Sequence, residues 1–425
     1  NEQVPLKNKN IKLLIPSMGR ALCEFSAAAF RGAGFRAEAA ANPTFETLMV
    51  GRAHSSCKEC LPLMMTTAAL INHVKSRDPD ELTLYFMPST SGNCRFAQYY
   101  VYIKGLIRKL RIKNVALMTL SAEQNYIGLN GFDQIKLLKA VILADIMDDI
   151  GNALLVLPKD KAKAREIFEE QWRKIVASLE SGSKNLYEVI EEVSQNLAAI
   201  ELRQTLEESK KVLLSGEIYV RKDEFTSNQI ISRLAEKGIV VKRSPLLEWL
   251  HYIDYISKNI LDTKFTFKER LHVFIKNTVE KHIETKIKST LAKSGLYEYE
   301  KIDIEKIFEK GKEFIDPRMT GEEILVIGTF FKEVAKHVHG VISLGPFACL
   351  PTRVCEAILN VETDVHDNHR IDHLDNAAQL KEFHTLPFLT IETDGNPFPQ
   401  IVEARLEAFS LQVVRMHQQM EKQAV

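Results

Sequence analysis

The chain has 425 residues, which is long enough for two or three domains with full-sized hydrophobic cores. Apolar residues make up 45% and charged residues 26%, as in an ordinary globular protein. Acidic and basic residues balance at 56 each, which gives no support to binding of nucleic acid or a membrane surface, because both call for a basic excess. The chain shows neither a signal-peptide pattern nor an apolar run of about 20 residues, so we expect a cytoplasmic protein.

The first part of the chain alternates between strand-like and helix-like segments. The segment IKLLIPSMG has the pattern of a buried strand that ends in a turn, and the small-residue segment RALCEFSAAAFRGAG predicts the helix after it. ELTLYFMP and VALMTL predict two further strands, with helices between them. Because such alternation is typical of a parallel, doubly wound sheet, residues 1–124 are predicted to form an N-terminal α/β lobe.

Residues 125–207 are predicted to be a helical segment, because apolar residues recur at helical spacing in stretches such as KLLKAVILADIMDDIGNALL. A C-terminal α/β lobe is predicted over 208–425, where KKVLLSGEIYV, VHGVISLGPFACLP and LPFLTIETDG have the pattern of strands. A helical insertion at about 246–322 interrupts this lobe, and a long helix from Pro399 closes it. The predicted fold class is therefore α/β, with two similar doubly wound lobes and additional helical segments.

Six cysteines are the residues that most suggest chemistry: Cys23, Cys57, Cys60, Cys94, Cys349 and Cys355. The cytoplasm would keep them reduced, and a chain with ample core has little use for disulfides, so metal or redox chemistry is favoured. Each cysteine taken alone is better explained as a small, buried apolar residue. However, five or six of them are predicted to lie in turns between a strand and the next helix. Such turns gather at one edge of a doubly wound sheet, so we expect the cysteines to meet in one crevice at the carboxyl ends of the strands.

The neighbouring helix N-termini are expected to favour thiolate over thiol and to stabilise an anionic cluster. Zinc is the competing metal. A structural zinc site usually takes two CxxC-like pairs, and only Cys57 and Cys60 form one here. Six thiolates also exceed the four ligands of one tetrahedral ion, so the donor set favours an iron–sulfur cluster while zinc stays an alternative.

Three longer segments carry a resemblance to a known family. They are GEIYVRKDEFTSNQIISRLAEKGIVV, SLGPFACLPTRVCEAIL and LPFLTIETDGNPFPQIVEARLEAF. They resemble the D-component of the 2-hydroxyacyl-CoA dehydratase superfamily. The N-terminal cysteine pattern resembles the branch associated with the CoA-enzyme activases, and within it the double-cubane cluster proteins. The likeness covers nearly the whole chain and is strongest in its C-terminal part.

The resemblance implies two flavodoxin-like lobes, a homodimer and a double-cubane [8Fe-9S] cluster, in which a sulfide bridges two [4Fe-4S] units. The ligands it implies are Cys23, Cys57, Cys60, Cys94, Cys349 and Cys355. It further implies electron transfer from a separate ATP-hydrolysing [4Fe-4S] reductase of the actin-like ATPase fold. The activity would be low-potential reduction of small molecules such as acetylene, hydrazine and azide in an anaerobe. The chain itself has no phosphate-binding loop and no Rossmann glycine fingerprint, so we expect it to bind neither ATP nor NAD.

Two other functions stay open. One is a 2-hydroxyacyl-CoA dehydratase-like subunit, a lyase that holds one [4Fe-4S] cluster through three cysteines. The other is a non-catalytic electron carrier, which would accept electrons without turning over a substrate. Six cysteines argue against the dehydratase, because three suffice there.

Residues next to the cysteines are candidate proton donors to a bound substrate, and these are His54, Lys58, Glu59 and Arg95, together with Glu24 and Asn93. For each of them an ordinary loop residue, or a hydrogen-bonding partner of the ligands, is the alternative. Lys58 and Arg95 would also offset the charge of a cluster. A second histidine-rich stretch, DVHDNHRIDHLDN, carries His366, His369 and His373, for which a solvated loop is favoured over a divalent-metal site.

Overall fold

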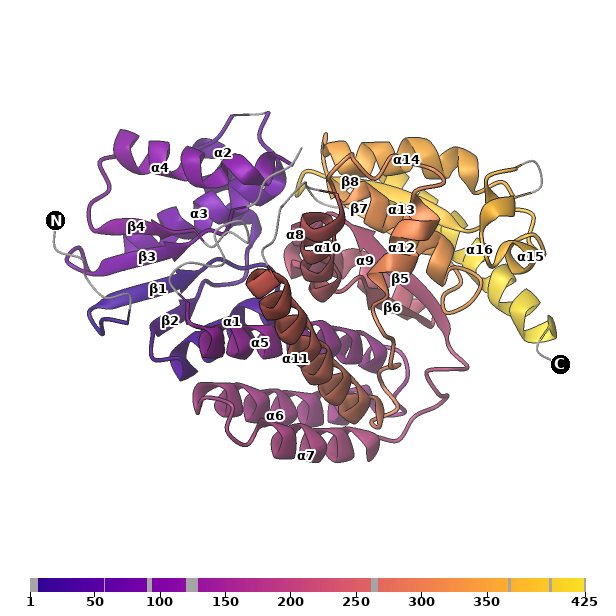
Figure 1. Ribbon diagram of the computed structural model, residues 1–425, viewed down its shortest axis with the longest axis horizontal. Helices are drawn as coiled ribbons and strands as arrows, with labels where there is room; N and C mark the ends of the chain where they lie inside the picture. The colour runs from indigo at the N-terminus through magenta and orange to yellow at the C-terminus, as the bar shows by residue number, and fades with distance from the viewer. Residues whose placement is uncertain are drawn as a thin grey trace.

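The computed structural model describes residues 7–56, 58–89, 94–119, 129–260, 267–365, 368–396 and 400–423. Over these residues the chain forms two parallel four-stranded sheets, each flanked by helices, and a block of helices that lies against both lobes (Figure 1). The prediction of an α/β fold with two doubly wound-like lobes is confirmed.

The N-terminal lobe is built on a sheet with strand order β2-β1-β3-β4. Its strands are β1 Ile11–Ile15, β2 Arg36–Ala39, β3 Leu82–Phe86 and β4 Val115–Met118. Its helices are α1 Arg20–Gly32, α2 Phe45–Ala53, α3 Leu61–Ser76, the short η1 Arg95–Gln98 and α4 Tyr99–Lys109. Helices cover both faces of the sheet, which explains why consecutive strand residues such as Leu13 and Leu14 are both buried.

The C-terminal lobe repeats this arrangement with strand order β6-β5-β7-β8. Its strands are β5 Lys210–Gly216, β6 Ile239–Arg243, β7 Val341–Pro346 and β8 Phe388–Thr393. Its helices are α8 Ile218–Lys222, α9 Glu224–Glu236, α14 Leu350–Glu362, η3 Ile371–His373, α15 Ala377–Leu380 and α16 Gln400–Gln423. In each lobe the first strand has the second strand on one side and the third on the other, so the order of strands changes direction between β1 and β3 and between β5 and β7. Ligands bind at such a switch point in open α/β sheets.

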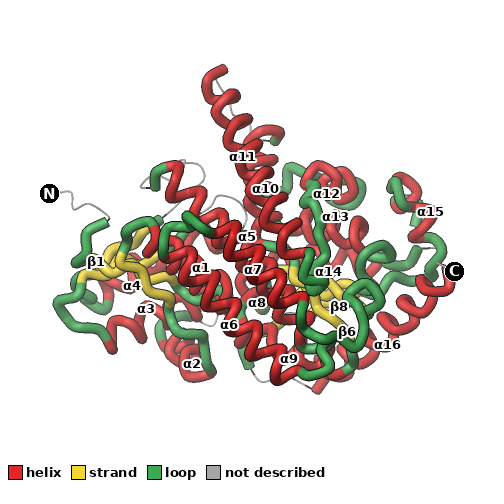
Figure 2. Tube along the Cα trace, turned by 90° about the horizontal axis from the view of Figure 1, so that it is seen from below, coloured by secondary structure: helices red, strands yellow, loops and turns green. Residues whose placement is uncertain are grey.

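The remaining helices connect and support the lobes. They are α5 Gly131–Leu154, α6 Lys161–Glu180, α7 Leu186–Ala198, α10 Leu246–Asn259, α11 Phe267–Ala292, α12 Ile304–Gly311 and α13 Glu323–Glu333. Helices α5, α6, α7 and α11 share one hydrophobic core with α1 of the N-terminal lobe. Helix α11 packs against α5 and α7, and one of its ends extends beyond the body of the molecule (Figure 2).

The two lobes meet where their strands end. Leu48, Leu61 and Met65 of the N-terminal lobe belong to the same hydrophobic core as residues of β7 and β8. Gly19, which follows β1, lies so close to the backbone of Lys222, which follows β5, that a side chain at Gly19 would not fit. The carboxyl ends of the two sheets therefore face each other across the junction.

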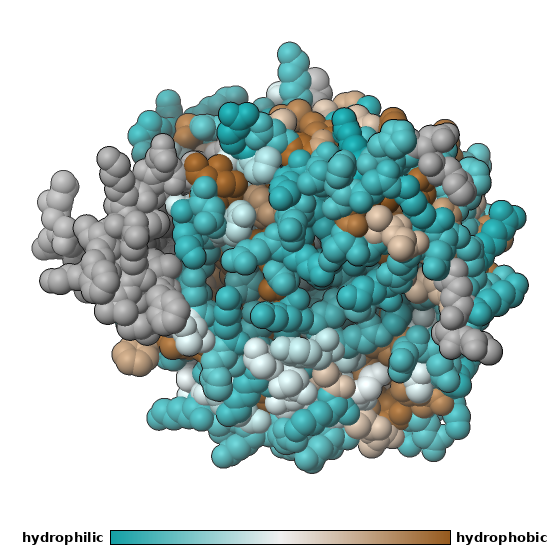
Figure 3. Space-filling model, turned by 45° about the vertical axis from the view of Figure 1, so that its right-hand side comes forward, coloured by the Kyte–Doolittle hydropathy of each residue, from teal (hydrophilic) through white to brown (hydrophobic). Residues whose placement is uncertain are grey.

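The surface is mainly polar. Figure 3 shows one face on which hydrophilic side chains predominate and apolar ones form small separate patches. Within the described ranges, no helix combines the length and the apolar character that crossing a membrane would require.

Gly216 sets the course of the chain as it leaves β5 for the junction. Its φ of 101° is in the left-handed region, and a Cβ there would clash with the backbone of Leu344 in β7. We expect Gly216→Ala to lower the free energy of unfolding by about 3 kcal/mol or more, because left-handed strain and overpacking add. The matched control is Gly238→Ala, whose φ is 70° with no atom near the added methyl, and it should cost about 1–2 kcal/mol. If urea denaturation shows that Gly216→Ala and Gly238→Ala lower the free energy of unfolding equally, the special role of Gly216 is contradicted.

Candidate functional site

Three cysteines occupy the same structural position in three different helices. Cys60, Cys94 and Cys349 are the N-cap residues of α3, η1 and α14. Cys94 and Cys349 come after the carboxyl ends of β3 and β7, as the sequence predicts. Both α3 and α14 begin with the sequence Leu-Pro directly after the cysteine, and proline in the first turn favours the start of a helix there.

These three thiols share one electrostatic neighbour, the carboxyl group of Glu217. Glu217 follows β5 at the junction and caps α8 by accepting a hydrogen bond from the backbone N–H of Val220 at 3.0 Å. Burial raises the pKa of Cys60, Cys94 and Cys349, and the Glu217 carboxylate raises it further in each case. The thiols of Cys94 and Cys349 also interact with each other. Cysteines from both lobes are therefore gathered at one point.

Arg95 ties the cysteine-bearing turns together. Its Nη1 donates to the backbone oxygen of Lys58 at 2.5 Å, and its Nη2 donates to that of Ala348 at 3.2 Å. One guanidinium thus links the turn before Cys60, the turn at Cys94 and the turn before Cys349 across the two lobes. The positive charge of Arg95 also acts to lower the pKa of Cys60, although burial outweighs it.

Tyr99 contacts the site from within the N-terminal lobe. Its Oη lies 2.6 Å from Sγ of Cys60, and its ring is buried. Burial raises the pKa of Tyr99 well above its usual value, and the neighbouring Cys60 thiolate and Glu217 carboxylate add to the effect. The phenol therefore keeps its proton and shares a hydrogen bond with the sulfur of Cys60.

Cys23 and Cys355 differ from these three, because they lie within helices and not in turns as the sequence analysis expected. Cys23 is in the first turn of α1, packs in the N-terminal core with Leu13 and Phe30, and donates to the backbone oxygen of Arg20 at 3.6 Å. Cys355 is fully buried in α14 and donates to the backbone oxygen of Glu323 at 3.6 Å. The thiol of Cys355 interacts electrostatically with that of Cys349. Cys57 lies outside the described residues.

The helix N-termini act towards thiolate at Cys60 and Cys349, as the sequence analysis expects, but burial outweighs them in the metal-free protein. Burial raises the pKa of Cys23 and of Cys349 to about 12, and it raises that of Cys94 further. Backbone N–H groups of Leu63 and Thr352 act in the opposite direction at Cys60 and Cys349, but they are outweighed. A metal that binds here must therefore displace the thiol protons.

Among the predicted proton-donor candidates that the structure describes, Arg95 is the one whose side chain hydrogen-bonds residues of both lobes. The backbone oxygen of His54 accepts a hydrogen bond from Tyr102, and the carboxylate of Glu59 accepts one from Ser56 at 3.1 Å. Lys58 is exposed. Glu24 is engaged by Trp172 Nε1 at 2.7 Å and by Arg20, and its carboxylate adds to the effect of burial in raising the pKa of the adjacent Cys23.

Some predicted residues fall elsewhere. Asn93 and His366 lie outside the described residues. His369 is exposed beside Asp372, and His373 lies in the short η3. In the part of the chain that the structure describes, the one group of potential metal ligands close enough to share an ion is Glu300, Glu333 and His337, which does not include these histidines.

The sequence analysis missed Glu217, Glu322 and Tyr99. Glu217 follows the carboxyl end of a strand, as Cys94 and Cys349 do. Residues in that position gather at one edge of a parallel sheet, so Glu217 would also have been selected on the grounds that were applied to the cysteines. Burial raises the pKa of Glu322 to about 8, with the Glu217 carboxylate as the next largest cause. One of these two carboxyls therefore holds a proton near neutral pH. Tyr99 has no comparable signal, because its contact with Cys60 depends on the packing of α4.

No protein-family model matches this chain, and no curated protein matches it. The resemblance described above therefore rests on the sequence motifs themselves, and the cofactor and partner that it implies stay predictions.

The donor set around Glu217 suits an iron–sulfur cluster. Cys60, Cys94 and Cys349 provide thiols from three separate segments, and the surroundings are shielded from water. A structural zinc site takes four such ligands, and Cys57, the nearest further thiol in the sequence, lies outside the described residues, so zinc stays the alternative. Thiolates with nearby N–H and O–H donors, such as Tyr99, are the environment in which proteins hold such clusters.

The raised thiol pKa values predict slow alkylation of the metal-free, folded protein. We expect the iodoacetamide reaction of Cys60 and Cys349 to be slow at pH 7 and to rise roughly tenfold per pH unit up to pH 9, because the thiolate fraction grows without levelling off. Peptide mass spectrometry measures each site. The guanidinium-unfolded chain is the control, in which the rates should level off near the ordinary thiol pKa. A folded-state rate that levels off below pH 8 would show a lowered pKa instead.

Proposed function

We propose that this chain holds an iron–sulfur cluster between its two lobes and acts as the substrate-reducing component of a low-potential oxidoreductase. The observation that carries the proposal is the Arg95 guanidinium, which lies next to Cys94 in the chain and hydrogen-bonds the turns before Cys60 and Cys349, so that cysteine-bearing turns of both lobes are joined. The Glu217 carboxylate acts on the pKa of all three thiols. Following the family resemblance, the cofactor is a double-cubane [8Fe-9S] cluster. The electron donor is a separate ATP-hydrolysing [4Fe-4S] reductase, and the working form is a homodimer.

The residues around the site have distinct tasks in this proposal. Cys60, Cys94 and Cys349 bind the cluster, and Cys57, three residues before Cys60 in the sequence, adds a further ligand. When bound, the cluster supplies one-electron transfer at low potential. Tyr99 donates a hydrogen bond to the Cys60 thiolate, and Arg95 holds the turns in register while its charge offsets that of the thiolates.

The electron donor has an accessible approach beside the site. Phe347 and Leu350 flank Cys349 on the surface and are 66% and 51% exposed. Exposed apolar side chains next to a site are a common feature of protein interaction surfaces. The proposed substrates are small molecules of the acetylene, hydrazine and azide type, which need little space between the lobes.

A dehydratase-like subunit with one [4Fe-4S] cluster is the second candidate. It is favoured by the difference in position between the three N-cap cysteines and the two cysteines that lie within helices, Cys23 and Cys355. A double cubane needs all six cysteines as ligands, these two included. A carrier without substrate turnover would share either cluster and differ only in activity.

Single serine variants distinguish these candidates. If the cluster is a double cubane, Cys23→Ser and Cys355→Ser should lower iron from about eight per chain, as should Cys60→Ser, Cys94→Ser and Cys349→Ser. If the cluster is a single cubane, only the last three variants should lose iron, from about four. Iron is measured by mass spectrometry of anaerobically purified protein, and the reduced cluster by electron paramagnetic resonance.

Ser56→Ala is the control, because it changes the same turn as Cys57 and Cys60 without removing a thiol. It should keep the full iron content. Full iron content and an unchanged resonance signal in the Cys60, Cys94 and Cys349 variants would remove the basis of the proposal.

A further inference from the structure

Helix α13 carries polar groups along one buried face. Glu322 caps its N-terminus near the cysteine site, and Thr329 and Glu333 follow at spacings of seven and four residues. These spacings place the three side chains on the same side of a helix. The helix is about 16 Å long, so this row of side chains extends from Glu322, near the cysteine site, to Glu333 at the other end of the helix.

The middle of this face is occupied by Glu248 of α10. Its Oε2 accepts a hydrogen bond from Thr329 at 3.2 Å, and its side chain is buried. Burial raises the pKa of Glu248 to about 7, while Arg221, Thr329 and Lys332 act to lower it. The carboxyl therefore exchanges its proton near neutral pH. Glu248 also interacts with Glu322 on one side and with Glu333 on the other.

A small cavity continues from Glu248 to the end of α13. Its volume is about 60 Å³, and its lining includes Glu248, Thr329, Glu300 and Glu333 together with apolar side chains. This volume has room for roughly four water molecules, which these four polar side chains would hydrogen-bond.

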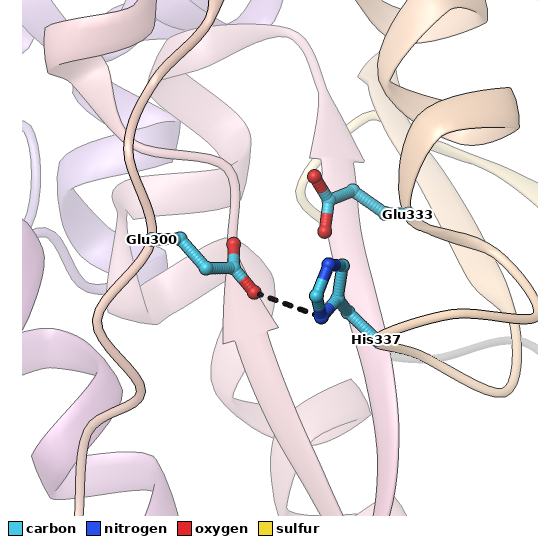
Figure 4. Close-up of side chains that lie close together, drawn as sticks. All are labelled: Glu300, Glu333 and His337. Atoms are coloured by element: carbon cyan, nitrogen blue, oxygen red, sulfur yellow. Dashed lines mark ion pairs between the residues drawn. The ribbon is translucent and has the colours of Figure 1, made fainter.

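The far end of the face opens to solvent at three side chains. Glu300, Glu333 and His337 bring one ligand atom each to within 4.8 Å of one another, and Glu333 points towards the imidazole (Figure 4). Glu333 is 5% exposed, and its Oε2 has no hydrogen-bond partner among the described residues. His337 is 35% exposed, so it joins this buried carboxylate to the surface.

A divalent cation is a poorer occupant of this trio than a proton. The ammonium of Lys242 lies 2.6 Å from Glu300, and that of Lys332 pairs with Glu333. An ion with two positive charges would have to displace both lysines. A proton that passes between an imidazole and a carboxyl displaces neither.

We propose that His337, Glu333, the cavity and Glu248 form a path that carries protons from solvent to Glu322, next to the cysteine site. The inference rests on the proposed function, because reduction of a small molecule consumes protons together with electrons. Each acetylene that is reduced to ethylene takes up two electrons, supplied by the reductase, and two protons, supplied along this path. Arg221, Lys242 and Lys332 balance the carboxylates on the way.

The test compares neutral, isosteric variants of the holoprotein. Glu248→Gln and Glu333→Gln should lower acetylene reduction with the ATP-dependent reductase at least tenfold and increase the solvent deuterium isotope effect. Iron content and the resonance signal of the reduced cluster should not change. His337→Ala should show a smaller loss, which free imidazole in the buffer restores. Asp133→Asn, which alters a buried carboxylate paired with Lys7 in the N-terminal lobe and away from this path, is the control and should keep full activity.

Unchanged rates and isotope effects in Glu248→Gln and Glu333→Gln would overturn the path. Loss of activity together with loss of iron would also overturn it, because the role of the carboxyls would then be structural. Infrared spectroscopy of the metal-free protein separates this from a failure of the proposed function. The protonated-carboxyl band near neutral pH should lose the contribution of one group in Glu248→Gln and stay the same in Asp133→Asn. An unchanged band in Glu248→Gln would overturn the path even if the chain holds no cluster.

Discussion

A parallel sheet gathers the turns that follow its strands at one edge, and in this protein two such edges face each other. The contact of Gly19 with Lys222, the shared core around Leu48 and the hydrogen bonds of Arg95 hold them in that orientation. Everything proposed for the site depends on this arrangement, because Cys60 and Cys94 come from one edge and Cys349 from the other. Neither lobe alone would assemble the three thiols.

Burial decides the electrostatics of the junction. The helix N-termini favour thiolates at Cys60 and Cys349, but the loss of water contacts is the larger effect and keeps the thiols protonated. The same loss raises the pKa of Glu322 and Glu248 into the neutral range. A site of this kind stores protons when no metal is bound and offers them near neutral pH, which suits chemistry that adds protons and electrons together.

The sequence predicted both lobes, because alternating strand and helix patterns are local properties of segments such as IKLLIPSMG. It also placed Cys94 and Cys349 correctly at the strand-to-helix turns. It did not separate Cys23 and Cys355 from the others, because α1 and α14 begin several residues before them. The thiol pKa values, the contact of Tyr99 with Cys60 and the alignment of Glu248 with α13 depend on packing between distant segments, which no local pattern reveals.

The most direct measurement of the central claim is the content of iron and acid-labile sulfide per chain in anaerobically purified protein. About eight irons and nine sulfides are expected if the junction holds a double cubane through six thiolates. About four of each would assign a single cluster to Cys60, Cys94 and Cys349 and favour the dehydratase-like function. Zinc without iron would contradict the account, because the site would then have no redox chemistry.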